Sequence, residues 1–494
     1  MLTAKPDDCD LWKRYAIDAG REHDLIVFSD RTDNKLCFNF LDYQSQHAGG
    51  GGLVFNLVSL VETILQSQEK DGGKSSSDPF WTNSVRMLLR NGFTLLKLAN
   101  DYVSMSDLQK LVLSAPTNPD QVEAWEPLEE QQEQLTERQR EILEASKAWH
   151  STSYCCDVIS LAMERAATDM ERHDVNHATE FWCVTWPNLP HDTRQSVAIT
   201  FLSLADYFLT GSLRELFTTG TDVSPLDCLN GKIIVVDLPV LEYQTVGVLA
   251  ASIWKYLFQL TVTQRRITDS SRPVFLWADE AQLTLLKTDT AFATVARGFR
   301  CATVYLTQNL DTYYHALSSQ HPHQAKVAID SLTGNLNTKI FQMNTSPTTN
   351  TWASELIGKE WVWHGANIST GTSSKLGEWA SHTDNVGAQR VLKQRVDPIE
   401  FTRLATGGPQ WNWQVSAYVF QGGRRFDTSG ENFLLATFSQ DFARSSSLPD
   451  EEPDDPDTLT VSCPHCDSDS DWSAADRGHK AVCPDCRQSF RLPG

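Results

Sequence analysis

The pattern of apolar and polar positions changes along this chain. Leu25 to Phe28 form a short apolar run before a polar turn, which is typical of a β-strand. From residue 78 to residue 217, apolar side chains recur at the spacing of a helix. Within this block, Ser106 followed by Gln109 fits the capping box of a helix start. The pattern therefore predicts an all-helical block inserted after a strand-containing first segment.

Beyond residue 217, apolar runs of strand length alternate with helical patterns. "GKIIVVDLP" is almost continuously apolar, as expected of a strand buried on both faces of a parallel sheet. Helical stretches such as Val246 to Arg266 separate it from the runs "PVFLWADEA", "CATVYLTQN", "NTKIFQMN" and "WQVSAYVFQ". This alternation predicts an α/β fold with a doubly wound, mostly parallel sheet.

Polar side chains follow three of these predicted strands. Asp237 follows the first run, Asp279 and Glu280 follow the second, and Gln308 follows the third. Ligands of such sheets bind at the carboxyl ends of the strands. We therefore expect the functional site at this edge.

The pair Asp279–Glu280 after "RPVFLWA" is typical of a nucleotide-hydrolysing strand. In such enzymes the aspartate holds magnesium through water, and the glutamate polarises the attacking water. Gln308, on the next predicted strand, would sense the terminal phosphate or position that water. The plain alternative is that the two carboxylates begin a helix, where the helix dipole favours negative charge.

Two arginines precede the strand of Gln308. Arg297 or Arg300 would be placed to reach a neighbouring subunit's nucleotide as an arginine finger, which stabilises transition-state charge in trans. Surface arginines on a helix are the alternative interpretation.

A phosphate-binding loop does not accompany the carboxylate pair. The motif Gly-x4-Gly-Lys-Ser/Thr links a strand to a helix. Gly73-Lys74-Ser75 is preceded by a helical pattern, and Gln68 occupies the position of the first glycine. The run Gly49–Gly52 has no following lysine and is interpreted as a hinge. The sequence therefore predicts no phosphate cradle within this chain.

The composition limits how nucleic acid would be bound. The formal net charge is -21, whereas a protein that binds nucleic acid over its whole surface is usually basic, because neutralised phosphates supply most of the affinity. Any such contact is therefore expected in a local groove or pore. No apolar run is long enough to span a membrane, and no secretory signal follows Met1, so we expect a cytoplasmic protein.

Four cysteines near the end of the chain form the strongest local motif. Cys463 and Cys466 form one Cys-x2-Cys pair, and Cys483 and Cys486 form a second. Each pair places two thiolates on one side of a tetrahedron, and the intervening length suits a small hairpin. The spacing predicts a closed structural zinc site whose metal supplies the folding energy of a small zinc ribbon.

Taken together, these stretches resemble the coupling-protein ATPases of conjugation and type IV secretion, in their TraD/TraG-like branch with a TraM-recognition-type domain. The matching segments lie between residues 1 and 420 and include "DLIVFS", "DPFWTNSVRMLLRN", "GKIIVVDLP", "RPVFLWADEAQ", "VARGFRCATVYLTQNL" and "LTGNLNTKIFQMN". In this family the phosphate loop, known as Walker A, and the strand after it precede the segment that opens this chain. This departure puts the binding of ATP in doubt.

The resemblance implies a RecA-like P-loop NTPase core that carries an all-helical domain and assembles into hexamers around DNA. It matches Asp279 and Glu280 to the Walker B carboxylates, Gln308 to the sensor glutamine, and Asn335 to the asparagine before the next strand. It implies DNA or nucleoprotein as substrate, and relaxosome or secretion-channel proteins as partners. It also implies association with the inner membrane through those partners, and ATP with Mg²⁺ as cofactors only where a phosphate loop is supplied.

The predicted organisation has five parts. The RecA-like core comprises 1–77 and 218–440, the helical insertion 78–217, the acidic linker 441–460, and the zinc ribbon 461–494.

Three functions remain open at this level. The first is a coupling-type ATPase. The second is a catalytically silent relative that binds cargo through its helical domain and ribbon, and the third is a helicase or repair translocase built on the same core.

Overall fold

The computed structural model describes most of the chain. It covers residues 1–47, 58–59, 61, 79–123, 126–130, 135–286, 288–317, 322–364, 389–440 and 458–491, the last with gaps at 463, 467–468, 474–478 and 484–485. The segments of Gly49–Gly52 and of Gly73-Lys74-Ser75 therefore lie outside the described residues. Two compact units are found, Met1–Ala405 with Ser416–Ala436, and Thr406–Val415 with Thr437–Gly494.

Parallel strands form the centre of the first unit. β1 (Leu25–Phe28) pairs in parallel with β2 (Ile233–Val236), and β3 (Val274–Ala278) pairs in parallel with β4 (Cys301–Tyr305). Each strand coincides with a predicted apolar run. Burial accounts for the continuous apolar run of β2, in which Ile234, Val235 and Val236 are buried, whereas Phe275 of β3 is 58% exposed.

The first residues of the chain join these two pairs into one sheet. Leu2 forms parallel bridges to Val236 of β2 and to Ala278 of β3. The Leu2 N–H donates to the Trp277 carbonyl at 2.9 Å, and the Val236 N–H donates to the Met1 carbonyl at 2.9 Å. The order is therefore β1, β2, the segment Met1–Thr3, β3, β4.

Helix α14 (Thr245–Gln264) is buried on nearly all sides, which explains why it is apolar all round. It is the one single helix among the described residues that is long and apolar enough to cross a membrane. The burial of its side chains within the protein accounts for this composition. The bent pair α10 (His191–Tyr207) and α11 (Gly211–Thr218) passes the same test only if its two helices are counted as one span.

Lys255 of this helix forms a fully buried ion pair with Asp289. Lys255 Nζ lies 2.7 Å from Asp289 Oδ2, and both side chains are 0% exposed. Gln259 Nε2 donates to the other oxygen of Asp289 at 2.7 Å, and the Lys255 ammonium lies 5.4 Å from the centre of the Tyr305 ring. Burial lowers the pKa of Lys255, and the Asp289 carboxylate opposes that change. The pair fixes α14 to the first turn of α15 (Thr288–Val295), beside Tyr305 at the end of β4.

Shorter helices surround these strands. They are α1 (Asp7–Asp18), η1 (Glu22–Asp24), α2 (Phe40–His47), α12 (Pro225–Leu229), α13 (Val240–Tyr243), η6 (Ala281–Thr284), α15 (Thr288–Val295), α16 (Leu310–Leu317) and α17 (Pro322–Asn335).

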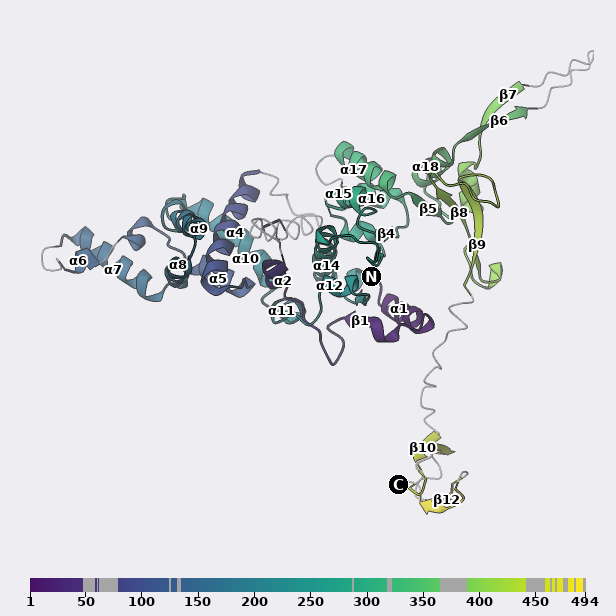
Figure 1. Cartoon of the computed structure of the whole chain (residues 1–494), viewed down its shortest axis with the longest axis horizontal. Helices are drawn as coiled ribbons and strands as arrows, with labels where there is room; N and C mark the ends of the chain where they lie inside the picture. Colours follow the sequence, from purple (N-terminus) through teal and green to yellow (C-terminus); the bar gives the residue numbers. More distant parts are fainter. Residues whose placement is uncertain are drawn as a thin grey trace, which may run out of the picture. The chain divides into compact units, whose positions relative to one another are not determined.

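Only helices are found among the described residues between 79 and 218, as predicted. They are α4 (Pro79–Asn100), α5 (Met105–Ser114), η3 (Pro119–Val122), α6 (Glu126–Glu129), α7 (Glu137–Thr152), α8 (Tyr154–Arg165), α9 (Asp169–Glu180), the π-helical turn η5 (Phe181–Thr185), α10 (His191–Tyr207) and α11 (Gly211–Thr218). α4 contacts α5, α8, α9 and α10, and these helices form the bundle labelled in Figure 1. Phe93, Trp182 and Phe201 are fully buried in its core.

The predicted cap at Ser106 is wrong. α5 begins at Met105, and the side chain of Ser104 accepts the Asp107 N–H at 3.0 Å. Ser104 Oγ in turn donates to Asp107 Oδ2 at 2.8 Å, so this reciprocal pair, rather than Ser106 with Gln109, starts the helix.

The later strands do not extend the parallel sheet in the described part of the chain. β5 (Thr338–Phe341) pairs antiparallel with β8 (Gln414–Gln421), which also neighbours β9 (Phe433–Ser439). Phe341 and Phe420 pack with residues of α18 (Pro347–Ile357) and η7 (Pro398–Arg403) in a separate small core. The prediction of a mostly parallel sheet therefore holds for the strands before β5 only.

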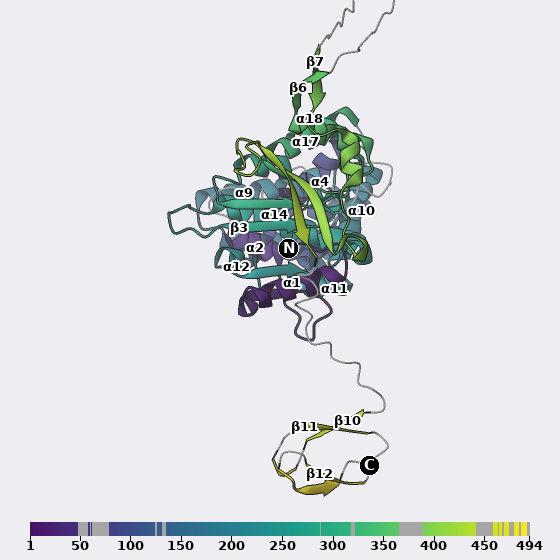
Figure 2. The ribbon, with the colours of Figure 1, turned by 90° about the vertical axis from the view of Figure 1, so that its right-hand side faces the viewer.

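The remaining elements are hairpins. β6 (Lys359–His364) and β7 (Gln389–Gln394) pair antiparallel, and Figure 2 shows them projecting together beyond α18. In the second unit, β10 (Thr458–Ser462) pairs with β11 (Asp469–Ser473), β12 (Lys480–Val482) pairs with β13 (Ser489–Arg491), and η8 (Pro409–Trp411) precedes them. The two compact units do not separate the helical block from the core, and the five predicted domain boundaries stay predictions.

Replacing Lys255 by Met should destabilise the protein by about 3–5 kcal/mol, because Asp289 is left as an uncompensated buried charge. Chemical denaturation measures this change. Lys255→Met/Asp289→Asn should lose less than the single variant, since the buried charge is then gone. The matched control Lys326→Met, in an exposed pair with Asp330, should change stability by less than about 1 kcal/mol. A single variant as stable as this control contradicts the account.

Candidate functional site

The predicted partners Glu280 and Gln308 meet at the carboxyl edge of the parallel sheet. Glu280 follows β3 and Gln308 follows β4, whose register aligns their ends. Gln308 Nε2 donates a hydrogen bond to Glu280 Oε1 at 2.8 Å. Because parallel strands end at the same edge, the two side chains converge although 28 positions separate them.

The backbone of Glu280 turns sharply to make this contact. Its φ of 42° and ψ of 49° lie in the left-handed region, which costs a non-glycine residue about 1 kcal/mol or more. Its side chain is buried, and its second oxygen accepts a hydrogen bond from Gln282 Nε2 at 2.7 Å. Both oxygens of Glu280 are therefore held by neutral amides. A buried carboxylate supported only by amides and a strained turn is typical of a functional site.

Asp279 points to a different neighbour. Its Oδ2 lies 3.9 Å from Lys5 Nζ, in the segment that follows the inserted residues Met1–Thr3. Burial raises the pKa of Asp279, with Asp8 nearby adding to the effect, while the Glu280 N–H and Lys5 act in the other direction. Asp279 is thus a partly enclosed carboxylate at the rim, beside Glu280 in sequence, and within the described part of the chain it forms no hydrogen bond with Gln308.

A loop from the antiparallel part of the first unit is hydrogen-bonded to Gln308 and its neighbours. Asn344, which follows β5, donates through Nδ2 to the Gln308 carbonyl at 2.6 Å. Ser346 Oγ donates to Asp311 Oδ2 at 2.6 Å, and the Leu310 N–H donates to Thr349 Oγ1 at 3.0 Å. These bonds fix the strand end that presents the Gln308 side chain.

A second polar cluster lies at the carboxyl ends of β1 and β2. Ser29 Oγ donates to Asp237 Oδ2 at 3.1 Å, and the other oxygen of Asp237 is buried without a hydrogen-bond partner in the described structure. Burial raises the pKa of Asp237. The third predicted strand-end carboxylate therefore lies at the same sheet edge as Glu280, with the Met1–Thr3 segment between their strands.

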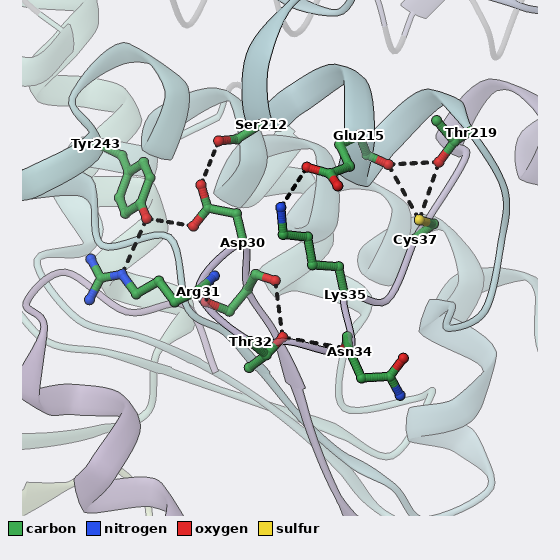
Figure 3. Close-up of polar contacts among 11 residues, drawn as sticks. Asp30, Arg31, Thr32, Asn34, Lys35, Cys37, Ser212, Glu215, Thr219 and Tyr243 are labelled. Carbon is green, nitrogen blue, oxygen red and sulfur yellow. Dashed lines mark hydrogen bonds and ion pairs between the residues drawn. The ribbon is translucent and has the colours of Figure 1, made fainter.

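The loop after β1 is fixed by mutually satisfied polar groups, shown in Figure 3. Asp30 accepts from Ser212 of α11 and from Tyr243 of α13, each at 2.5 Å. Lys35 Nζ lies 2.7 Å from Glu215 Oε2 of α11. Since each of these charges already has a partner, the cluster anchors the loop to α11 and α13.

The two arginines lie at the opposite, amino-terminal end of β4. Arg300 donates to the carbonyls of Asp269 and Ser271 at 2.9 and 2.8 Å, which fixes the turn before β3. Arg297 is exposed in the turn after α15. Neither lies at the edge that carries Glu280 in the same chain, so action on a neighbouring subunit stays a prediction. Asn335 ends α17, ahead of β5, and Asn344 rather than Asn335 contacts the Gln308 strand end.

One edge of β4 is unoccupied by any strand in the described part of the chain. The Val274 N–H donates to the Arg300 carbonyl, and the Leu306 N–H donates to the Ala278 carbonyl, both at 3.0 Å. Alternate residues of a parallel strand bond to opposite sides. Residues 302 and 304 therefore bond to β3, whereas the backbone groups of Thr303 and Tyr305 point to the open side.

Three of the four predicted zinc ligands converge in the second unit. The sulfur atoms of Cys466, Cys483 and Cys486 lie within 4.8 Å of one another, and Cys466 Sγ lies 3.7 Å from Cys483 Sγ. Tetrahedral zinc with Zn–S bonds of about 2.3 Å requires sulfur atoms about 3.8 Å apart. The described thiols therefore fit the predicted metal, while Cys463 lies outside the described residues.

Among the comparisons with known proteins, the one with solved structures found matches. No family model and no curated protein matches the chain. Its structural neighbours are conjugative coupling proteins. The unbound monoclinic form of the bacterial coupling protein TrwBdeltaN70 has a TM-score of 0.47 and 13% identity over 84% of this chain and 73% of that one. The plasmid coupling protein TrwB with the GTP analogue GDPNP has a TM-score of 0.48 and 14% identity over 85% and 74%. TrwB with ADP and Mg²⁺ has a TM-score of 0.45 and 14% identity over the same shares. At these values, function has to be argued from the residues themselves.

Sequence reasoning missed three residues of this site. Lys5 reaches Asp279 only because Met1–Thr3 joins the sheet, which no local pattern indicates. Gln282 follows the predicted pair directly in the sequence. Asn344 closes the run "NTKIFQMN" and follows a strand, so the same rule that selected Gln308 would have found it.

Replacing Asp279 by Asn should raise the melting temperature at pH 7. Burial raises the folded-state pKa of Asp279 above its usual 3.8, so the native state binds the proton more tightly and stability falls as pH rises through the folded pKa. Asparagine avoids that cost, and the difference from wild type should shrink as pH falls from the folded-state pKa towards 3.8. Thermal unfolding between pH 3 and pH 8 checks this.

Glu171→Gln provides a control of opposite sign. Hydrogen bonds from Thr168 lower the pKa of Glu171, so this substitution should lower stability at pH 7. An Asp279→Asn variant that is less stable than wild type at pH 7 would contradict the assigned cause.

Proposed function

We propose that this chain is the core of a coupling-type ATPase of a conjugation or type IV secretion system, which recruits and helps to translocate DNA or nucleoprotein. The observation that carries the proposal is the 2.8 Å hydrogen bond between Gln308 and Glu280 at the carboxyl edge of a parallel sheet. A glutamate directly after a strand-end aspartate, positioned by an amide from the adjacent strand, is the arrangement that nucleotide hydrolysis uses.

The residues have separable roles in this proposal. Asp279 would hold Mg²⁺ through water, which suits a partly exposed carboxylate. Glu280 would polarise the attacking water, and Gln308 would orient Glu280. Mg²⁺ held there together with nucleotide would supply positive charge that neutralises the phosphates. Each oxygen of Glu280 accepts one amide hydrogen bond, which leaves a second lone pair on each oxygen to accept a hydrogen bond from the attacking water.

The open side of β4 supports a location for the phosphate loop. A strand added there would pair with the free backbone groups of Thr303 and Tyr305. A glycine-rich loop at its carboxyl end would then lie beside Gln308. The backbone amides of such a loop form a nest that binds phosphate.

The cysteine cluster is proposed to bind structural zinc through Cys463, Cys466, Cys483 and Cys486. The fit of three thiols to tetrahedral spacing supports this assignment. The small core of Ala481, Cys483 and Phe490 is too limited to stabilise the fold by burial alone. The ribbon would therefore fold with its metal and present a docking module to a partner.

The proposal also includes the assembly of the chain into a hexamer and its location in the cell. A hexamer would bring each subunit's edge near a neighbour, as the arginine-finger role of Arg297 or Arg300 requires. Relaxosome or secretion-channel proteins would be the partners, and the chain would act on the cytoplasmic side of the inner membrane.

A second candidate is a catalytically silent cargo adaptor. It is favoured by the sequence itself, in which Gly73-Lys74-Ser75 lacks the first glycine of the phosphate-loop motif. The adaptor would keep the fold and the ribbon but bind no nucleotide.

Mg²⁺-ATP binding separates the two candidates. Residues 1–494 should bind ATP weakly or not at all, whereas the same chain preceded by an in-frame segment encoding Gly-x4-Gly-Lys-Ser/Thr should bind and hydrolyse it. Glu280→Gln in that longer protein should keep ATP affinity and lose about 100-fold or more of the turnover. Isothermal titration and phosphate release measure the two quantities. Wild-type turnover in Glu280→Gln, or no ATP binding by the longer protein, contradicts the ATPase proposal.

The purified chain should hold one zinc ion. Cys483→Ser and Cys463→Ser should each lose it, because three thiolates cannot close the site, whereas Cys37→Ser, remote in sequence from the motif, should keep it. Elemental analysis gives the stoichiometry. Full zinc retention in Cys483→Ser would rule out this ligand set.

A further inference from the structure

The β6–β7 hairpin carries two exposed tryptophans on one face. In its register, Trp361 pairs with Leu392 and Trp363 pairs with Arg390. Since side chains alternate along a strand, Lys359, Trp361 and Trp363 share a face, with about 6.6–6.8 Å between successive members. Trp361 is 60% exposed and Trp363 is 66% exposed. Large aromatic surfaces left in water at this spacing mark an interaction site.

Cationic groups accompany these rings. The Arg390 guanidinium lies 5.3 Å from the centre of the Trp363 ring. The described residues of the two strands carry Lys359, Arg390 and Lys393 against one carboxylate, Glu360. This balance is opposite to that of the whole chain, with its formal net charge of -21.

A pocket at the base of the hairpin extends the cationic surface. Its volume is about 430 Å³, and Lys359, Arg395, Arg424 and Arg425 line it. Its one carboxylate, Glu431, is engaged by Arg395 at 2.5 Å. No ion pair is found for Lys359, Arg424 or Arg425 within the described residues. The pocket thus offers three uncompensated cations next to the first position of the aromatic face.

We propose that the tryptophan face of β6–β7 and the pocket at its base bind single-stranded nucleic acid. Bases stack on Trp361 and Trp363, and backbone phosphates contact Lys359, Arg424 and Arg425. Aromatic platforms beside a cationic groove are the general means of binding single strands without sequence preference. The tryptophan spacing is about twice the 3.4 Å rise per nucleotide of one strand, so the two rings match alternate positions along a stacked strand.

The observations favour a single strand over the other occupants. A duplex keeps its base faces stacked inside, so it offers nothing to the indole rings. A membrane surface is bound by a cluster of inserting apolar side chains, and beside the two indole rings this face of the hairpin offers only Leu392, opposite Trp361. A subunit interface would leave the uncompensated cations of the pocket unexplained.

This inference deepens the proposed function, since it names the form of nucleic acid that the chain would contact. It rests on other atoms than the nucleotide site. Absence of ATP hydrolysis by the longer protein that carries a phosphate loop, with retained oligonucleotide binding, would count against the ATPase alone, and the reverse result would count against this site alone.

Fluorescence anisotropy of a labelled 20-nucleotide oligothymidine with the full chain tests the proposal. Trp361→Ala/Trp363→Ala should weaken binding about tenfold or more, because each stacked base contributes on the order of 1–3 kcal/mol. The control Trp411→Ala, also an exposed tryptophan at 44%, should leave affinity unchanged. Melting temperatures should match wild type in both, because exposed rings contribute little to stability.

Salt dependence tests the pocket separately. Arg424→Gln/Arg425→Gln should reduce the slope of log affinity against log salt by about 1.4, since each phosphate contact on a single strand contributes about 0.7.

Unchanged affinity in the tryptophan variant overturns the proposal, as does tighter binding of a 20-base-pair duplex. If the tryptophan variant lost binding to phosphatidylserine vesicles but kept its oligonucleotide affinity, the face would be a membrane surface instead. A change in molar mass by light scattering would identify a subunit interface.

Discussion

The backbone pairing of Met1–Thr3 between β2 and β3 is the interaction on which the rest of this structure depends. Leu2 bridges Val236 and Ala278, which lie more than two hundred positions away in the sequence. Without this segment, β1–β2 and β3–β4 would be two separate ribbons. With it, all five strands run in one direction, so Asp237, Asp279 and Glu280 are delivered to a single edge together with Gln308.

That edge combines carboxylates and amides with few cations. Glu280 is buried in a left-handed turn and is held by two glutamine amides, while Asp279 has only the distant Lys5 ammonium. Carboxylates of this kind can hold a metal or polarise water, and the described residues of this edge include no glycine-rich loop that would bind phosphates. The open side of β4 lies next to Gln308, so a phosphate loop in the proposed position would lie beside these carboxylates.

The sequence predicted the parts of this arrangement that depend on local patterns. β1 to β4, α14 and the pairing of Glu280 with Gln308 follow from apolar runs and from the rule that parallel strands share an edge. Lys5 was not predicted because its contact needs long-range pairing that no window of sequence carries, whereas Asn344 was missed although it closes a predicted strand run. β6 was missed although "KEWVWH" alternates. An exposed hairpin buries neither face, so its strands lack the single apolar face by which a strand is usually identified. Ser104 displaced Ser106 because both fit the start of α5 and only side-chain geometry decides between them.

The central claim is that Glu280 and Gln308 are bonded at the carboxyl edge of the sheet. A double-mutant cycle with Glu280→Ala and Gln308→Ala, followed by chemical denaturation, measures their coupling most directly. A buried hydrogen bond to a charged group predicts a coupling free energy of about 1.5–3 kcal/mol. Additive effects of the two substitutions would mean that the side chains do not meet, and the account of this edge as a hydrolytic site would then be wrong.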